Sequence, residues 1–189
     1  KINPRLIFAQ IKGFAPDGPY ASYLSFDNIA QATGGALSIT GEPDGEPMHS
    51  GYPIGDAVGG VFGALGLLAA LWKRAKDPHA PGEEIDLSMT EATMKLMDVL
   101  AIEHDQLGAV RERSGNANQY SAPAAVYGTK DKRWVSLAGS TNPLYANNCR
   151  AIGRPDLIDD PRFANNARRV QHAKELNGIF AAWCAQHTL

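Results

Sequence analysis

The apolar residues of this chain are most concentrated in one stretch near its middle. Residues 57–72 carry no charge, and their large apolar side chains recur at three- and four-residue spacing, which predicts a long helix within residues 50–76. The side expected to face the core consists of Val61, Leu65, Leu68, Leu71 and Trp72. A second stripe, which another backbone or a flat ligand could approach closely, consists of Gly59, Gly60, Gly63 and Gly66. Because each glycine costs helix propensity relative to alanine, so many of them call for such a reason.

A carboxylate stands where this helix is expected to begin. Asp56 follows Pro53 and Gly55, and the next charged residue is Lys73. We expect Asp56 at the N-cap, where unpaired backbone N–H groups and the positive end of the helix dipole keep a carboxylate ionised. From the residues alone, Asp56 is either a plain cap or a nucleophile.

The remaining pattern predicts alternating strands and helices. Strands are expected at residues 6–11 and 84–89 and, as a hairpin, at residues 124–129 and 133–138. Helices are expected at residues 25–33 (opened by Ser25 and closed by Gly34-Gly35), 90–109, 143–152 and 168–185. We interpret the apolar stripe of the helix at residues 90–109 as core; its members are Met94, Met97, Leu100 and Ala101. The predicted fold class is α/β.

Composition excludes several classes of function. A net charge of −2 among 189 residues leaves no electrostatic footprint for nucleic acid or an anionic membrane, and the uncharged stretch is shorter than a membrane span needs. The five histidines are scattered and no HExxH or CxxC pattern occurs, so no metal site is expected. The GxSxG, GxGxxG and P-loop patterns are also absent. The two cysteines, Cys149 and Cys184, are far apart, which favours a reducing cytoplasm.

Both ends of the sequence indicate a piece of a longer polypeptide. The chain opens on Lys1 rather than Met, with no signal-peptide pattern, and its last amphipathic stretch, residues 179–189, has nothing after it to pack against. A change in composition near Arg111 marks the expected domain boundary. Residues 1–110 are expected to belong to an open-sheet large domain, and residues 111–189 to a linker and the start of a small α+β domain.

A series of short motifs, in order along nearly the whole chain, carries a resemblance. The motifs are Asn3-Pro4-Arg5-Leu6-Ile7, Gly13-Phe14, Gly18-Pro19, Asp27 with Gln31-Ala32 and Gly34, Gly41-Glu42-Pro43-Asp44-Gly45, Asp56-Ala57 with Gly59, Ala69-Ala70-Leu71, Gly82 to Met89, Asp159-Asp160-Pro161-Arg162-Phe163, and Arg169. No single motif is specific, but their joint order resembles the middle of a family III CoA-transferase, the group that contains formyl-CoA and carnitine CoA-transferases.

The resemblance implies a fold, a reaction and a nucleophile. Residues 1–110 would be part of a Rossmann-like, CoA-binding large domain, and the activity would move CoA from an acyl-CoA donor to a free carboxylate. The family's catalytic aspartate corresponds to Asp56, which would form an aspartyl anhydride and then an aspartyl-CoA thioester. Coenzyme A and acyl-CoA would be substrates, with no cofactor bound permanently.

The resemblance also suggests supporting residues and an assembly. Asp27 matches an acidic position near the acyl site, while Gln31, His49 and Tyr52 are weaker candidates chosen for their proximity in sequence. Gly59 and Gly60 would clear space for pantetheine or the acyl group, and the N–H groups of the helix start could stabilise an oxyanion. The full-length protein is expected to form a homodimer whose chains interlock like linked rings.

Two other functions remain open. An acyl-CoA racemase or isomerase of the same scaffold would carry a histidine directly before Asp27, where this sequence has Phe26, so one of its two bases would be missing. A non-catalytic fragment would use Asp56 as a cap and the glycine stripe for packing.

Overall fold

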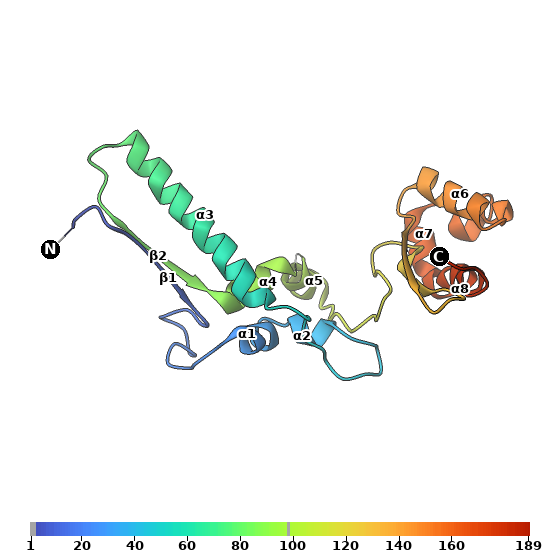
Figure 1. Cartoon of the computed structure of the whole chain (residues 1–189), viewed down its shortest axis with the longest axis horizontal. Helices are drawn as coiled ribbons and strands as arrows, with labels where there is room; N and C mark the ends of the chain where they lie inside the picture. The colour runs from blue at the N-terminus through green and yellow to red at the C-terminus, as the bar shows by residue number, and fades with distance from the viewer. Residues whose placement is uncertain (1–2, 98) are drawn as a thin grey trace. The chain divides into compact units, whose positions relative to one another are not determined.

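The computed structural model describes residues 3–97 and 99–189. Its internal contacts divide the chain into two units, Lys1–Arg113 and Ser114–Leu189, which we describe one at a time (Figure 1). The division lies close to the composition change at Arg111.

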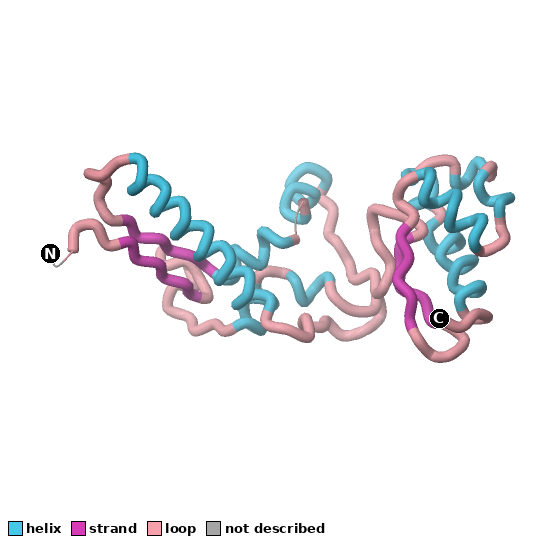
Figure 2. The backbone as a smooth tube through the Cα atoms, turned by 45° about the horizontal axis from the view of Figure 1, so that its top comes forward, coloured by secondary structure: helices cyan, strands magenta, loops and turns pink. Residues whose placement is uncertain are grey.

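The first unit is built around two parallel strands and a long helix. β1 (Ile7–Lys12) pairs with β2 (Glu83–Ser88), with Ile7 opposite Glu83 and Lys12 opposite Ser88. α3 (Ile54–Lys76) lies alongside both strands (Figures 1 and 2). Shorter helices complete the unit: α1 (Asp27–Thr33), α2 (Ala36–Ile39), α4 (Met89–Leu96) and α5 (Leu100–Leu107). The two predicted strands are confirmed to within one residue, and the mixture of helix and strand confirms the α/β class.

The helix α3 contacts the strands through its glycines. A Cβ atom added at Gly59, Gly63 or Gly66 would lie 3.5 Å from Ile11, 3.1 Å from Ile11 and 2.9 Å from Ile85, respectively. The expected core side is instead exposed among the described residues, with Val61 66% and Trp72 67% accessible. The expected core-facing side was therefore wrong, whereas the close approach expected at the glycine stripe is confirmed at Gly59, Gly63 and Gly66. The branched side chains of the strands fill the space between sheet and helix, so only a face without side chains can approach them closely.

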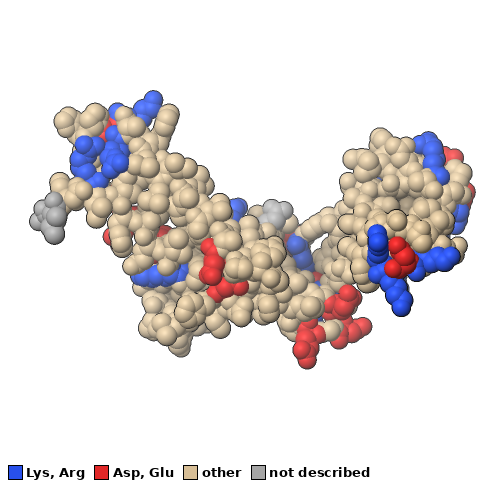
Figure 3. Space-filling view, viewed as in Figure 1, with Lys and Arg blue, Asp and Glu red and all other residues tan. Residues whose placement is uncertain are grey.

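The outer face of α3 is apolar along most of its length. Figure 3 shows few charged side chains over the body of the helix, and its basic residues, Lys73, Arg74 and Lys76, lie in the last turn. At 23 residues, α3 is long and apolar enough to cross a membrane by length and composition, which corrects the expectation that the stretch is too short. A mostly buried core helix of a soluble protein passes the same test, whereas 28% of the apolar window of α3 is buried in this structure.

The orientation of α3 predicts opposite effects for two glycine substitutions. A Cβ at Gly60 would meet no atom within 4 Å, so Gly60→Ala should raise the free energy of unfolding by about 0.5–1 kcal/mol through helix propensity. Gly66→Ala should lower it by about 1–2 kcal/mol, because the new methyl group would overlap Ile85. Urea denaturation of both variants measures the difference. A Gly66→Ala protein more stable than the Gly60→Ala protein would contradict the packing of the glycine face on the sheet.

The predicted helix at residues 90–109 is two helices, α4 and α5, with an interruption after Leu96. Its methionine stripe does not lie in a filled core, since Met94 is 46% exposed. The stripe instead forms part of the wall of a cavity of about 280 Å³ at the C-terminal end of α1, lined by Thr33, Gly34, Gly35, Ser38, Met94, Met97, Leu100, Ala101 and His104. Apolar spacing alone does not distinguish a wall of this kind from core, because both require large apolar side chains on one face.

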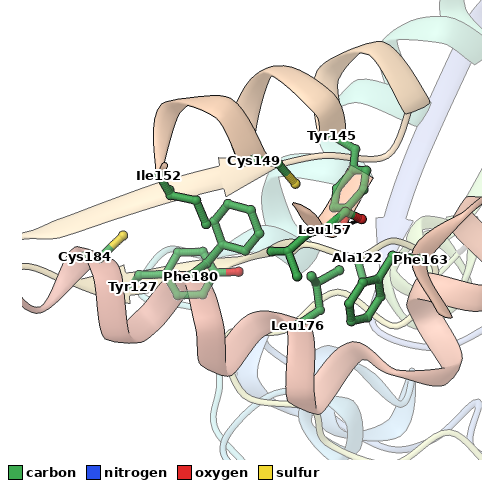
Figure 4. Close-up of a cluster of buried hydrophobic side chains, with 10 residues drawn as sticks. All are labelled: Ala122, Tyr127, Tyr145, Cys149, Ile152, Leu157, Phe163, Leu176, Phe180 and Cys184. Carbon is green, nitrogen blue, oxygen red and sulfur yellow. Dashed lines mark hydrogen bonds between the residues drawn. The ribbon is translucent and has the colours of Figure 1, made fainter. Parts of the chain in front are cut away.

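The second unit packs helices against a hairpin. β3 (Ala124–Gly128) and β4 (Trp134–Ala138) are antiparallel, as predicted. The helices are α6 (Asn142–Ala151), α7 (Asn166–Gln171) and α8 (Ala173–Cys184), with short 3₁₀ helices at Pro155–Ile158 and Pro161–Phe163. The single helix expected at residues 168–185 is thus divided at His172. Figure 4 shows the core, in which Tyr127, Phe180 and Cys184 lie together. Burial raises the pKa of Tyr127 to about 12.

A buried arginine connects the segments of this unit. Arg169 is fully buried, and its guanidinium donates to the carbonyl oxygens of Ala122, Ser140 and Phe163 at 2.9, 3.0 and 3.1 Å and to Asn142 Oδ1 at 2.9 Å. It also lies 4.5 Å from the centre of the Tyr145 ring. The bonds to Ala122 and Phe163 satisfy carbonyl groups of buried residues, and those to Ser140 and Asn142 are part-buried, so Arg169 has a structural role in the second unit.

Candidate active site

The helix α3 begins two residues before Asp56. Pro53 occupies the N-cap, Ile54 is the first helical residue, and Asp56 lies in the first turn with its side chain exposed. The expectation that Asp56 is the N-cap is therefore wrong. Proline has no side-chain acceptor, so Pro53 cannot cap the helix itself.

The cap comes from a different helix. Asp27, in the first turn of α1, accepts hydrogen bonds at Oδ1 from the backbone N–H of Gly55 (2.7 Å) and of Asp56 (3.3 Å). Its negative charge therefore lies at the positive end of α3, and it satisfies two N–H groups that have no partner within the helix. Asp27 performs the capping role that the sequence assigned to Asp56.

A buried glutamine links Asp27 to the loop before α3. Gln31 is 1% exposed, and its Nε2 donates to Asp27 Oδ2 at 2.7 Å. Its Oε1 accepts from the backbone N–H of Ser50 at 3.0 Å. A carboxylate that can only accept and an N–H that can only donate determine the orientation of the Gln31 amide. Gln31, predicted as a weak substrate-binding candidate, is in this structure a link between α1 and the loop.

The loop itself carries the two other weak candidates. Ser50 Oγ donates to the carbonyl oxygen of Tyr52 at 2.5 Å, and that oxygen also accepts from the N–H of Ile54 at 2.8 Å. The Tyr52 side chain is 62% exposed. His49 is exposed too, and its Nδ1 lies 2.6 Å from the Ser50 carbonyl oxygen, which places the proton of a neutral ring on Nδ1. Both side chains lie on the segment that leads to Asp56, and their binding roles stay predictions.

The glycines near Asp56 have three different surroundings. A Cβ at Gly55 would lie 3.1 Å from Asp27 Oδ1 and 3.2 Å from Ala30 Cβ, so Gly55 permits the close approach of α1. Gly59 is buried and faces Ile11, Leu87 and Met89, which is incompatible with the expectation that it clears space for a ligand. Gly60 has open space beside it, as that expectation requires. The packing role of Gly55 was not predicted, although a glycine inside the first turn of a helix is a recognisable signal of close packing.

The backbone N–H groups of the first turn already have partners. The N–H of Ile54 donates to the Tyr52 oxygen, those of Gly55 and Asp56 donate to Asp27, and that of Ala57 donates to the Pro53 oxygen at 3.0 Å. An oxyanion could recruit them only by breaking these bonds. The expectation that they stabilise a tetrahedral intermediate is therefore not met in this structure.

The Asp56 carboxylate differs from the Asp27 carboxylate in having no structural partner. Within residues 3–97 and 99–189, no hydrogen bond or ion pair is recorded for the Asp56 side chain, whereas both oxygens of Asp27 accept bonds. Asp56 is exposed and lies in the first turn of a long helix. An accessible carboxylate with free lone pairs can act as a nucleophile.

Comparisons with known proteins identify relatives of this chain. The chain is 36% identical over 187 residues to succinyl-CoA–D-citramalate CoA-transferase of Chloroflexus aurantiacus, covering 99% of this chain and 46% of that protein. It is 38% identical over 171 residues to acetyl-CoA:oxalate CoA-transferase of Acetobacter aceti, covering 90% of this chain and 43% of that protein. The chain thus spans about half the length of the curated relatives it matches.

A solved structure and a family model give the same assignment. A CaiB/BaiF family protein from Brucella suis matches with a TM-score of 0.78 and 29% identity, over 99% of this chain and 49% of that one. The family model described as CoA-transferase family III matches residues 1–189. The chain therefore belongs to CoA-transferase family III.

Proposed function

We propose that the full-length protein transfers CoA from an acyl-CoA thioester to a free carboxylic acid, with Asp56 as the covalent nucleophile. The observation that carries this proposal is the division of roles between two carboxylates at one helix end. Asp27 caps α3, and Asp56 is left exposed with no structural partner among the described residues. Family membership supports the reaction class.

The reaction needs four exchanges at carbonyl carbon. The Asp56 carboxylate attacks the thioester carbonyl, the C–S bond breaks, and CoA thiolate leaves a mixed anhydride on Asp56. The thiolate then attacks the aspartyl carbonyl, which releases the donor acid and forms an aspartyl-CoA thioester. The acceptor carboxylate attacks that thioester, which regenerates an anhydride and free thiolate. Attack of the thiolate on the acceptor's acyl carbon releases the new acyl-CoA and free Asp56, so no net proton or electron is consumed.

The acceptor that we propose is a small dicarboxylic acid. The names of the two relatives described above include D-citramalate and oxalate, and both of these acids carry two carboxylates. One carboxylate would react while the other would orient the molecule. Coenzyme A itself enters and leaves as part of the substrates.

Trapping of the intermediate tests the nucleophile. The full-length protein is incubated with succinyl-CoA without acceptor, treated with hydroxylamine and digested for mass spectrometry. The peptide that contains Asp56 should carry a hydroxamate, and the peptide with the exposed loop carboxylate Asp44 should not. CoA exchange that proceeds with no label on Asp56 would remove this residue from the mechanism.

The racemase alternative predicts a different product. At the position of the racemase histidine the structure has Phe26, which is 81% exposed and has no titratable group. A racemase in D₂O would incorporate deuterium at the carbon next to the thioester carbonyl. We expect CoA exchange without that incorporation.

The interlocked homodimer and the cytoplasmic location remain predictions for the full-length protein. Light scattering at several protein concentrations gives the molar mass, which measures whether the protein is a dimer.

A further inference from the structure

The Asp27 carboxylate joins three segments of the first unit. It belongs to α1, it accepts from the first turn of α3, and through Gln31 it is connected to the loop at Ser50. We infer that Asp27 is a positioning residue, whose hydrogen bonds to the Gly55 and Asp56 amides hold the nucleophile in its reactive place. This inference rests on the proposed function, because it assumes that Asp56 is the group to be positioned.

The remote origin of this cap distinguishes it from an ordinary one. A side chain at the N-cap residue would satisfy the helix end but would leave that end free to move relative to its neighbours. Asp27 lies 28 residues before Gly55, so the same bonds that cap α3 also hold its first turn against α1. The backbone of Asp56 is therefore located by α1 as well as by its own helix.

The fit around Asp27 is close enough for this restraint to matter. A Cβ at Gly55 would lie only 3.1 Å from Asp27 Oδ1 and 3.4 Å from Thr93 Oγ1, so α1, α3 and α4 meet here with no room for a larger residue. Thr93 and Gln31 are each 1% exposed. The bonds of Asp27 to Gln31 and to the Gly55 amide are partly shielded from water, which strengthens them relative to fully exposed bonds, whereas its bond to the Asp56 amide is exposed.

Gln31 determines the orientation of the Asp27 carboxylate. Because Gln31 Nε2 donates to Oδ2, the other oxygen, Oδ1, is directed at the two backbone amides. Asparagine at position 27 retains one acceptor oxygen for the Gly55 amide, but its NH₂ group would face the NH₂ group of Gln31. Asp27→Asn should therefore preserve part of the positioning, and Asp27→Ala should preserve none.

Steady-state kinetics of the full-length protein test this role. A displacement of about 1 Å at a reacting group can cost about 100-fold in rate. We expect Asp27→Ala to lower kcat by about 30- to 100-fold, with KM for the acyl-CoA donor within about threefold. The kcat of Asp27→Asn should be at least about tenfold higher than that of Asp27→Ala. The matched control is Asn28→Ala, an exposed neighbour on the same helix, which should leave both constants unchanged.

A second measurement reports on the bonds without using activity. Hydrogen exchange of the Gly55 and Asp56 amides should accelerate at least about tenfold in Asp27→Ala relative to Asn28→Ala, since their acceptor is lost. Unchanged exchange in the folded Asp27→Ala protein would show that the carboxylate does not restrain this turn, and would overturn the inference.

The outcomes separate the inference from the proposed function. If Asp56 is labelled in the trapping experiment but Asp27→Ala retains kcat within threefold, the positioning role is wrong and the transferase proposal stands. A rise in KM with unchanged kcat would make Asp27 a substrate contact instead. Loss of kcat with no recovery in Asp27→Asn would assign the effect to charge and also overturn positioning. If Asp56 is never labelled, the function fails, and the exchange measurement still decides whether Asp27 restrains α3.

Discussion

Asp56→Ala should lower kcat for CoA transfer by at least about 10³-fold while hardly changing the stability of the protein. The large kinetic effect follows from loss of the carboxylate that forms the aspartyl anhydride in the proposed reaction. The small effect on stability follows from the structure, because Asp27 rather than Asp56 accepts from the helix amides. Loss of the favourable charge near the helix dipole should lower the free energy of unfolding by less than about 1 kcal/mol.

This combination distinguishes a nucleophile from a cap. Initial rates with a panel of acyl-CoA donors and dicarboxylate acceptors give kcat, and urea denaturation gives the free energy of unfolding. Asp44→Ala, which removes an exposed loop carboxylate, should change neither quantity. A variant at Asp56 that keeps more than a tenth of the wild-type kcat would rule out covalent catalysis by this residue.

Arg169→Leu should destabilise the second unit by about 3–5 kcal/mol. The substitution keeps apolar volume but removes every donor that the guanidinium directs at Ala122, Ser140 and Phe163. The buried carbonyl groups of Ala122 and Phe163 would then be left without that partner in the interior, at a cost of about 1–3 kcal/mol apiece before relaxation, and the part-buried bond to Ser140 would be lost as well. The contact with the Tyr145 ring would also be lost.

Hydrogen exchange in the α8 peptides of the full-length protein measures this effect, since α8 contributes Leu176 and Phe180 to the core. The control is Arg168→Ala, the exposed neighbour whose Nη1 donates to the Pro161 carbonyl oxygen at 3.0 Å. It should cost less than about 1 kcal/mol. If Arg169→Leu and Arg168→Ala lowered the stability of the second unit equally, the buried hydrogen bonds of Arg169 would contribute no more to stability than an ordinary surface bond.

The predicted elements and the predicted site differ in how far local sequence could determine them. Local sequence was enough to predict the strands at Ile7–Lys12 and Glu83–Ser88 and the hairpin at Ala124–Ala138. The patterns that indicate them, apolar alternation and turn residues, extend over only a few positions. The breaks after Leu96 and at His172 were missed because the apolar spacing continues across them. Asp56 was found from its residue type, its place before an apolar helix and the order of surrounding motifs.

The sequence by itself determined that a long apolar helix lies within residues 50–76 and that Asp56 stands near its start. Only the tertiary structure decided which carboxylate caps that helix and which face of α3 meets the strands. The cap is a bond between Asp27 and residues 28 and 29 positions away, which no local pattern encodes. The face was undetermined because α3 is apolar on several sides, and the bulk of Ile11 and Ile85 on the strands selects the glycine side.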